Sequence, residues 1–277
     1  MSKFKFIKSD LKNIEPLFDE YLHSLTDVTD DFWEGHIINA DIYKIQKDES
    51  VIGFFSIFDN EKFTSFYIYH EYLAQAQDIF KQILEDYKIQ TAFAATCDKL
   101  FLNLCFDFHK KIEMQAYFFD GTKIIQVREP EYKRELISEI RPEEIKEING
   151  KTDNFFGIES PEAYLKSGYK IFRLAENGED LGYGLVFRNT LSPEYYACGM
   201  VTLPEHRQKG VGRSLQLHMA DIICENGGIP VSGCGYHNIN SKRTIESAGR
   251  YSNVRLLNVW FVEKSSNSYP RQGSKEV

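Results

Sequence analysis

The sequence lacks the features that mark secreted, membrane-spanning or metal-binding proteins. Its five cysteines are odd in number and none lies in a CxxC pair, so neither a disulfide framework nor a cysteine zinc site is indicated. No apolar stretch is long and uncharged enough to cross a bilayer, and Met1–Phe6 contain no apolar signal region. We therefore expect a cytoplasmic protein with reduced thiols, no membrane partner and no bound metal.

The chain also lacks the excess of basic residues on which nucleic-acid binding depends. Its 33 lysines and arginines are outnumbered by 41 aspartates and glutamates, which gives a formal net charge of −8. Because a phosphate backbone attracts a positive surface, we expect no nucleic-acid partner. The acidic balance fits either simple solubility or a cationic or neutral substrate.

One turn combines glycines and basic residues without any acidic side chain. Val201–Ser214 is predicted to begin as a strand and end as a helix, with Arg207–Gly212 as the turn between them. The turn is neither a dinucleotide-binding GxGxxG loop nor a Walker A loop, since it has only two glycines and no Gly-Lys-Ser/Thr. Gly210 and Gly212 would allow close backbone approach, and the helix start offers free N–H groups to an anion. The turn is therefore either a phosphate or pyrophosphate site or an ordinary tight turn before a helix.

The order Arg-x-x-Gly-x-Gly, after a strand ending Val-x-Leu-Pro-Glu, resembles motif A of the GCN5-related N-acetyltransferases, the GNAT superfamily. In that family the loop binds the pyrophosphate of acetyl-coenzyme A. The resemblance implies an N-acetyltransferase that moves an acetyl group from acetyl-coenzyme A, as co-substrate, to a primary amine by direct attack. It covers roughly residues 139–264 well, and residues 201–249 carry it.

The order of predicted elements repeats itself along the 277 residues. The second half predicts strands at 169–174, 181–187, 195–203, 229–234 and 254–262, with a helix from Leu215 and another at 240–249. The first half shows the same order, with strands at 41–46, 51–57, 63–69, 91–96 and 114–119. With the resemblance, this predicts an α/β (α+β) fold of tandem GNAT-like domains, each a mixed, mainly antiparallel sheet flanked by helices. We expect domains at 1–130 and 131–264, and a disordered tail at 265–277.

The first half departs from the motif at the decisive turn. His70–Tyr72 falls where Pro204–His206 falls in the second half, but the residues that follow are Leu73–Asp78. This segment has no glycine, and Asp78 would repel phosphate. The first domain is therefore expected to be a degenerate copy that does not bind the coenzyme at this turn.

The resemblance assigns the coenzyme site residue by residue. The acyl-pantetheine arm would lie between two strands that splay apart, bonded to main-chain groups of one of them. Asn238 would bond the same arm, and either Asn240 or Ser241 would cap the last helix. The residues assigned to coenzyme binding are Met200, Val201 and Leu203 on the strand, Arg207, Gln208, Lys209, Gly210, Val211, Gly212 and Arg213 in the loop, and Asn238 and Ser241 beyond it.

The catalytic groups are less well defined. Many members of the family carry a tyrosine on the last helix as the acid for the leaving thiolate, but the corresponding residue here is Ile245. Tyr236 is the candidate acid, because a phenol is protonated at neutral pH; it could equally be an aromatic wall residue. Glu205 is the candidate base, or it compensates charge at the helix N-terminus. Glu194 is a second candidate base; weaker alternatives are Cys234 and His237 for the acid and His206 for the base.

The acceptor amine is expected to enter from the face opposite the coenzyme, built by residues 154–169. There Phe155–Gly157 and Tyr164 provide either an aromatic binding surface or the core beneath a loop. The acceptor could be a small molecule or a peptide, and the protein a monomer or homodimer. Two other functions stay open: a non-catalytic acyl-coenzyme A sensor, and an interaction protein that keeps only the fold.

Overall fold

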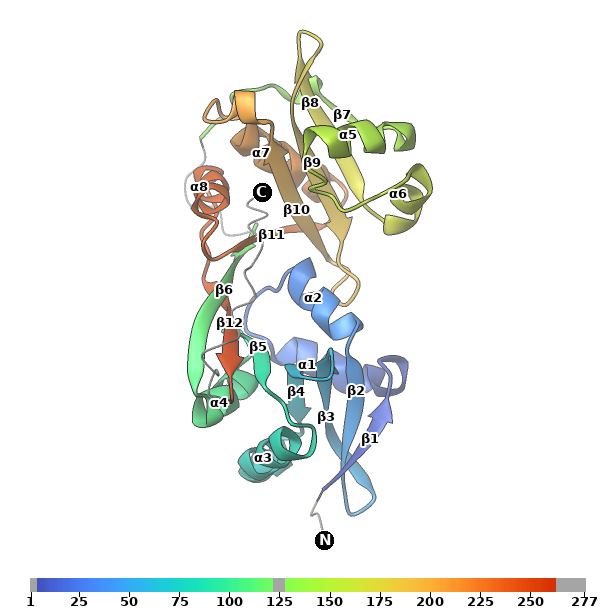
Figure 1. The fold of residues 1–277 in the computed structure, drawn as a ribbon, viewed down its shortest axis with the longest axis vertical. Helices are drawn as coiled ribbons and strands as arrows, with labels where there is room; N and C mark the ends of the chain where they lie inside the picture. Colours follow the sequence, from blue (N-terminus) through green and yellow to red (C-terminus); the bar gives the residue numbers. More distant parts are fainter. Residues whose placement is uncertain (1–3, 122–127, 263–277) are drawn as a thin grey trace. The chain divides into compact units, whose positions relative to one another are not determined.

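The computed structural model describes residues 4–121 and 128–262 (Figure 1). The predicted tail at 265–277 lies outside the described residues. The chain divides into two compact units: it passes from the first to the second after Tyr117 and returns to the first after Asn253. Each unit is built around a mixed sheet flanked by helices, which confirms the predicted fold class.

The first unit has the strand order β1-β2-β3-β4-β5-β12-β6. Its antiparallel pairs are β1–β2, β2–β3, β3–β4 and β5–β12, whereas β4 and β5 are parallel. The elements are β1 (Lys5–Ser9), η1 (Lys12–Ile14), α1 (Glu15–Ser24), α2 (Asp31–Ile38), β2 (Asp41–Lys47), β3 (Ser50–Phe58), β4 (Lys62–Ile68), η2 (His70–Gln75), α3 (Ala76–Asp86), β5 (Thr91–Ala95), α4 (Lys99–Phe108), β6 (Lys111–Asp120) and β12 (Val254–Trp260).

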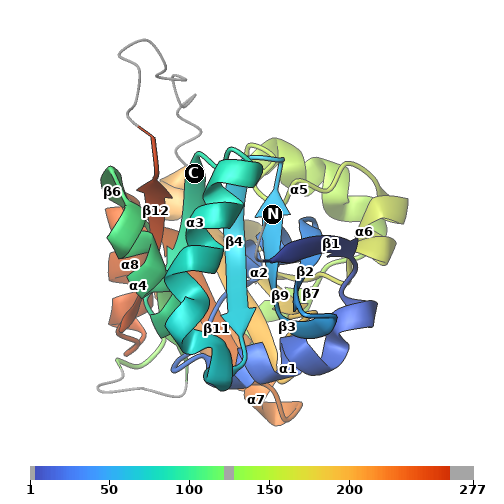
Figure 2. The same ribbon diagram turned by 90° about the horizontal axis from the view of Figure 1, so that it is seen from below.

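Amphipathic helices cover the sheet of the first unit (Figures 1 and 2). The residues of α3 that are buried, Ala76, Ile79, Phe80 and Ile83, recur at the spacing of one helix face. On that side the rings of Phe63 and Phe80 stack with centroids 4.9 Å apart. On the opposite side, Phe18 and Tyr21 of α1 pack on Phe54 of β3, and Trp33 of α2 stacks on Tyr21. Burial of these two faces forms the core of the unit.

The second unit has the strand order β7-β8-β9-β10-β11, with the last residues of β6 beside β11. Neighbours from β7 to β10 are antiparallel, and β10 and β11 are parallel. The elements are η3 (Arg134–Leu136), β7 (Ile137–Glu139), η4 (Pro142–Glu144), α5 (Ile145–Lys151), α6 (Pro161–Ser167), β8 (Lys170–Glu176), β9 (Glu179–Arg188), β10 (Tyr195–Thr202), η5 (Pro204–His206), α7 (Val211–Glu225), β11 (Ile229–Gly235) and α8 (Ile239–Ser247).

Both faces of this second sheet are buried. One face packs against α5 and α6 through a cluster that includes Ile145, Ile148 and Tyr183. The other packs against α7, where Leu215 and Met219 are fully buried. The sheet therefore separates an α5–α6 side from an α7 side. Side chains of β10 contribute to the packing on both sides.

The predicted domain limits differ from these compact units at two places. Phe118–Asp120, the end of β6, groups with the second unit, and β12 groups with the first. β12 pairs with β5 from Leu256 opposite Ala95 to Trp260 opposite Thr91. Its residues Leu257 and Val259 are part of the first unit's core. The alternation of apolar residues predicted the strand correctly, but alternation defines the buried face of a strand and not its neighbour in a sheet.

Candidate functional site

The turn between β10 and α7 adopts the conformation that its glycines allow. Gln208 and Gly210 both have positive φ, +62° and +81°, and Gly210 immediately precedes α7. A left-handed residue at this point suits glycine, which has no Cβ to clash with the backbone. Gly210 contributes no side-chain cap, and the first turn of α7 contains no acidic residue. The positive end of the helix is thus left without compensation from its own sequence.

The basic residues of the turn differ in exposure and in ion pairing. Arg207, Gln208 and Lys209 are exposed. Arg213, in contrast, is largely buried, and its Nη2 lies 2.5 Å from the Glu131 Oε1. The side chain of Arg213 is therefore already paired, whereas Arg207 and Lys209 have no salt-bridge partner among residues 4–121 and 128–262.

Glu131 lies against the start of α7, although it is distant in the sequence. A Cβ atom built on Gly210 would overlap the side chain of Glu131. The next residue continues along the helix: the Tyr132 N–H donates to Ser214 Oγ at 3.1 Å, and Tyr132 O lies 2.7 Å from His218 Nε2. A carboxylate thus stands beside the positive end of α7, where the sequence of the turn predicts no acid.

Gly212 is required by packing as well as by the predicted site. A Cβ atom at Gly212 would lie 2.8 Å from Cγ2 of Thr244 and 3.2 Å from Oγ1 of Thr202. The first distance is shorter than real Cβ contacts, so α8 can approach α7 this closely only because residue 212 is glycine. The close helix contact gives this glycine a structural purpose that is independent of any ligand.

The strands β10 and β11 separate beyond a short paired segment. They are paired only from Tyr195 opposite Ile229 to Ala197 opposite Val231. Both strands continue, β10 to Thr202 and β11 to Gly235. Met200 and Val201, two of the predicted coenzyme residues, therefore pair with β9 but not with β11. We call this divergence the fork; its geometry is the one that the resemblance implies for the pantetheine arm.

A buried polar cluster occupies the closed end of the fork. Ser232 Oγ donates to the carbonyl of Cys198 at 2.8 Å, and Gln216 Nε2 donates to the same carbonyl at 3.2 Å. The guanidinium of Arg250, 1% exposed, donates to the side chain of Gln216 at 2.9 Å. Burial raises the pKa of the Cys198 thiol, and the charge of Arg250 opposes that rise. No motif in the sequence marks Gln216, Ser232 or Arg250 as part of a site.

Asn238 is the cap of α8. Its Oδ1 accepts a hydrogen bond from the Ser241 N–H at 3.0 Å. The expectation that Asn240 or Ser241 caps this helix was therefore wrong: Asn240 lies within the first turn, and its carbonyl accepts from Thr244 Oγ1. The helix begins at Ile239, one residue before the predicted range 240–249, which places Asn238 at the capping position. Coenzyme contact by Asn238 and Ser241 stays a prediction.

The candidate catalytic residues lie at different places in the second unit. Glu205, in η5, is exposed and borders a cavity of about 550 Å³ with His206 and Glu179. His206 is buried, and its Nε2 lies 3.2 Å from Glu179 Oε1. Tyr236 follows β11 and contacts His237, ring to ring, at 5.3 Å; it is not among the residues that line this cavity. The structure thus does not bring Glu205 and Tyr236 together in one cavity.

The cavity beside Glu205 is strongly polar. Arg173 bridges Glu144 at 2.8 Å and Asp180 at 3.0 Å, and Lys151 contacts Asp180 at 2.7 Å. The Arg141 N–H and the Arg173 guanidinium lower the pKa of Glu144 to about 2. In these ion pairs the charges of Arg173 and Lys151 are balanced by carboxylates. Glu205, in contrast, has no ion-pair partner in the described part of the chain.

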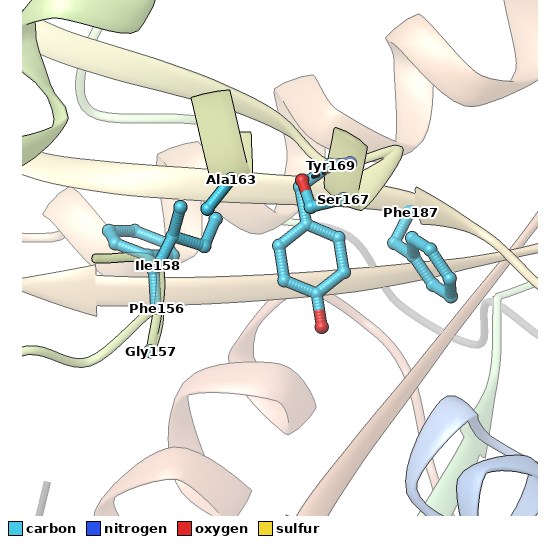
Figure 3. A pocket seen from close by; sticks show the side chains of 7 residues that line it. All are labelled: Phe156, Gly157, Ile158, Ala163, Ser167, Tyr169 and Phe187. Atoms are coloured by element: carbon cyan, nitrogen blue, oxygen red, sulfur yellow. Dashed lines mark hydrogen bonds between the residues drawn. The ribbon is translucent and has the colours of Figure 1, made fainter. Parts of the chain in front are cut away.

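A second, smaller cavity lies on the α5–α6 side and has an aromatic lining (Figure 3). It measures about 340 Å³ and includes Phe156, Ile158, Tyr169 and Phe187. Figure 3 shows the Tyr169 ring between Phe187 and the pair Phe156 and Ile158. Phe156 and Tyr164 are themselves core residues, 7% and 6% exposed. The predicted aromatic surface is therefore mostly core, with an opening at its edge.

The first unit contains a similar fork, between β4 and β5, but no glycine turn follows it. β4 and β5 pair only at Lys62 opposite Thr91 and Phe63 opposite Ala92, although both strands extend further. The following turn is the 3₁₀ segment η2, and α3 carries Asp78 in its own first turn. The helix start is thus compensated from within.

No helix in residues 4–121 and 128–262 is long and apolar enough to cross a membrane. In the same residues, no group of three or more His, Cys, Asp or Glu side chains is arranged to hold a metal ion.

One family model matches part of the chain. Residues 10–122 match the model of the acetyltransferase (GNAT) domain. The matched segment lies in the first half of the chain and covers less than half of its 277 residues. The family match falls on the half whose turn departs from motif A, so the likeness there rests on the rest of the domain. A search of curated proteins finds no match.

Solved structures resemble the chain over nearly its whole length. A GNAT-family acetyltransferase from Colwellia psychrerythraea is 18% identical, covers 94% of this chain and 100% of its own, and has a TM-score of 0.80. A GCN5-related N-acetyltransferase from Sphaerobacter thermophilus is 11% identical, with coverages of 96% and 98% and a TM-score of 0.60. A tandem GNAT protein from the clavulanic acid biosynthesis pathway is 10% identical, with coverages of 95% and 100% and a TM-score of 0.54. At these identities the likeness establishes the tandem GNAT fold.

Proposed function

We propose that the second unit binds acetyl-coenzyme A and transfers its acetyl group to a primary amine. The observation that carries the proposal is the combination of the fork with a left-handed glycine turn directly after it. The turn leads into α7, whose first turn lacks an acid of its own. An elongated ligand with a pyrophosphate at one end and a thioester at the other suits these two features in sequence.

The loop and the strand would divide the ligand between them. Main-chain groups of Met200, Val201 and Leu203 would bind the pantetheine arm in the fork. Amides at the start of α7 would bind the pyrophosphate, with Arg207 and Lys209 adding positive charge from exposed positions. Since Arg213 is paired with Glu131 and Asn238 caps α8, their side chains are available to a ligand only if those bonds are exchanged.

The reaction needs little chemistry from the protein. The amine nitrogen bonds to the acetyl carbon, the carbon–sulfur bond breaks, and the sulfur leaves as a thiolate. Holding both reactants in place is the larger contribution, worth up to about 7–11 kcal/mol. Glu205, an unpaired carboxylate bordering a cavity, is the group that we assign to removal of the amine proton. Tyr236 remains the candidate proton donor to the thiolate.

A second function is supported by one feature. Ile245 stands at the place of the tyrosine that many family members use as the acid, and its side chain is 1% exposed. A buried isoleucine cannot donate a proton. This favours, as the alternative, a non-catalytic acyl-coenzyme A-binding sensor or interaction protein, which would bind the coenzyme without transferring the acetyl group.

Calorimetric titration with acetyl-coenzyme A tests the proposal. Wild type should bind, and Lys209→Glu should bind at least tenfold more weakly because it places a negative charge beside the pyrophosphate. Lys166→Glu is the matched control, since Lys166 is an exposed lysine at the end of α6; its affinity should equal that of the wild type. Absence of binding by the wild type, or an equal loss in the control, would reject the assignment. Thiol release with an amine panel then separates the enzyme from the sensor.

A further inference from the structure

Arg250 is a buried cation for which the described residues provide no anion. It follows Gly249 at the end of α8, and its side chain is 1% exposed. A guanidinium remains protonated at physiological pH, and a buried charge is strongly unfavourable unless it is paired. Within residues 4–121 and 128–262, no carboxylate lies at ion-pair distance from Arg250.

Neutral groups alone hold the guanidinium. Nη1 donates to Gln216 Oε1 at 2.9 Å and to Ser232 Oγ at 3.1 Å. Nη2 donates to the main-chain carbonyl of Gln216 at 3.1 Å. Nε is buried without a hydrogen-bond partner, and the Cys198 thiol lies close enough to Arg250 for the guanidinium to oppose the rise in the thiol pKa. The three hydrogen bonds fix the orientation of the guanidinium. Among the described residues, its positive charge has no carboxylate counter-ion and its Nε–H has no hydrogen-bond acceptor.

The position of this charge is the closed end of the fork. Cys198 and Ser232 directly follow Ala197 and Val231, the last residues that pair β10 with β11. Ser232 Oγ joins the two strands through its hydrogen bond to the Cys198 carbonyl, and it accepts from Arg250 on its other side. The cation is thus held at the point where the two strands diverge.

We propose that Arg250 stabilises the coenzyme A thiolate that leaves during acetyl transfer, an inference that rests on the proposed function. When the carbon–sulfur bond breaks, its electron pair stays on sulfur, and the amine proton goes to a base or to water. A fixed cation in a water-poor site stabilises such a developing charge without reorganisation. Arg250 would stabilise the thiolate through its positive charge, whereas Ile245 cannot stabilise it by donating a proton. Its role would be electrostatic stabilisation of the sulfur and not proton donation.

The test uses coenzyme A and its desulfo analogue, so that no acceptor has to be known. If a cation faces the sulfur, the bound thiol should ionise at lower pH than the free thiol. The affinity for coenzyme A, relative to the desulfo analogue, should then rise with pH, by about tenfold for each unit by which the thiol pKa is lowered. Ultraviolet absorbance of the bound thiolate in the wild type gives the same pKa without any variant.

Variants separate this role from a structural one. Arg250→Met should abolish the pH-dependent difference between the two ligands, whereas Arg250→Lys, which keeps the charge, should retain part of it. Arg188→Met, at an exposed arginine at the end of β9, is the matched control and should leave the difference unchanged. A purely structural Arg250 would weaken both ligands equally. Should Arg250→Met fail to fold, an unshifted thiol pKa in the wild type still overturns the proposal, and a shift that is reduced in Arg250→Lys supports it.

The outcomes are distinguishable from failure of the proposed function. No binding of either ligand would overturn the proposed function and this inference together. Binding of both ligands with no pH-dependent difference would overturn the role of Arg250 alone. A difference that persists in Arg250→Met would do the same, because the source of the stabilisation would lie elsewhere.

Discussion

Gly212→Ala, combined with a second change at Thr244, distinguishes two reasons for glycine at residue 212: close packing against α8 and binding of the ligand. The added methyl would lie 2.8 Å from Cγ2 of Thr244 and 3.2 Å from Oγ1 of Thr202. Thr244→Ser removes Cγ2 and keeps the hydroxyl, which donates to the Asn240 carbonyl at 2.9 Å. The second substitution therefore relieves the closest clash and preserves the bond that Thr244 makes.

The expected cost of Gly212→Ala is the sum of two opposing effects. Forcing a methyl group into a packed contact costs about 1–3 kcal/mol, while alanine is a better helix former than glycine by up to about 1 kcal/mol. We expect a net loss of about 1–2 kcal/mol in the free energy of unfolding. For a chain of this size each kcal/mol lowers the melting temperature by about 2–4 °C. The double variant should recover about 1 kcal/mol of that loss.

Urea unfolding and acetyl-coenzyme A titration of all four members of the cycle give the answer. If the double variant regains stability but not coenzyme affinity, residue 212 must be glycine for the ligand as well as for α8. If it regains both, the glycine serves packing alone. A double variant no more stable than Gly212→Ala would refute the reasoning, because the contact with Thr244 would then not be the source of the strain.

Three further predictions concern stability. Asn238→Ala should lower the free energy of unfolding by about 0.5–2 kcal/mol through loss of the α8 cap, whereas Asn240→Ala should have little effect in the same urea titration. Burial raises the pKa of Asp98 to about 7, against about 3.9 in the unfolded chain. The folded state then binds the extra proton, so the free energy of unfolding should fall as the pH rises from about 4 to about 7. Asp98→Asn should flatten this profile, and an unchanged slope would contradict the assignment. A chain that ends at Asn253 should lose hydrogen-exchange protection in the first unit, because Leu257 and Val259 are missing from its core; equal loss in both units would argue against the placement of β12.

Features defined by local sequence were predictable. The alternation in β8 and β9 and the helical spacing in α3 each record which face is buried. The glycine turn was predictable for the same reason, since a left-handed residue before a helix is a local requirement. The sheet neighbour of β12 was not, because several strand edges of similar pattern compete for it and the choice depends on the assembled core.

The parts of the candidate site that sequence reasoning missed come from distant segments. Glu131 has no local signal that directs it to Gly210 and Arg213, about eighty residues away. Arg250, read in the sequence, is a basic residue after a helix-ending glycine, which is ordinarily exposed. Only the assembled sheet and α7 surround it with the main chain and side chain of Gln216. Asn238 was predictable in principle, since asparagine is a favoured cap, but a second asparagine two residues later competed for the assignment.

The two units keep the same fork and differ in how the helix beyond it is compensated. In the first unit, α3 carries Asp78 in its own first turn, so a carboxylate is covalently fixed at the positive end. In the second, α7 carries none, and the carboxylate comes from Glu131, half-exposed and attached through its pair with Arg213. A fixed carboxylate repels an incoming phosphate, whereas a carboxylate from another segment can be displaced, because the phosphate offers Arg213 and the helix the same favourable charge. The fork is part of the packed core and is preserved in both units by packing, while the chemistry depends on which side chain occupies the helix start. This difference explains how one chain can retain the fold twice and the predicted coenzyme site once.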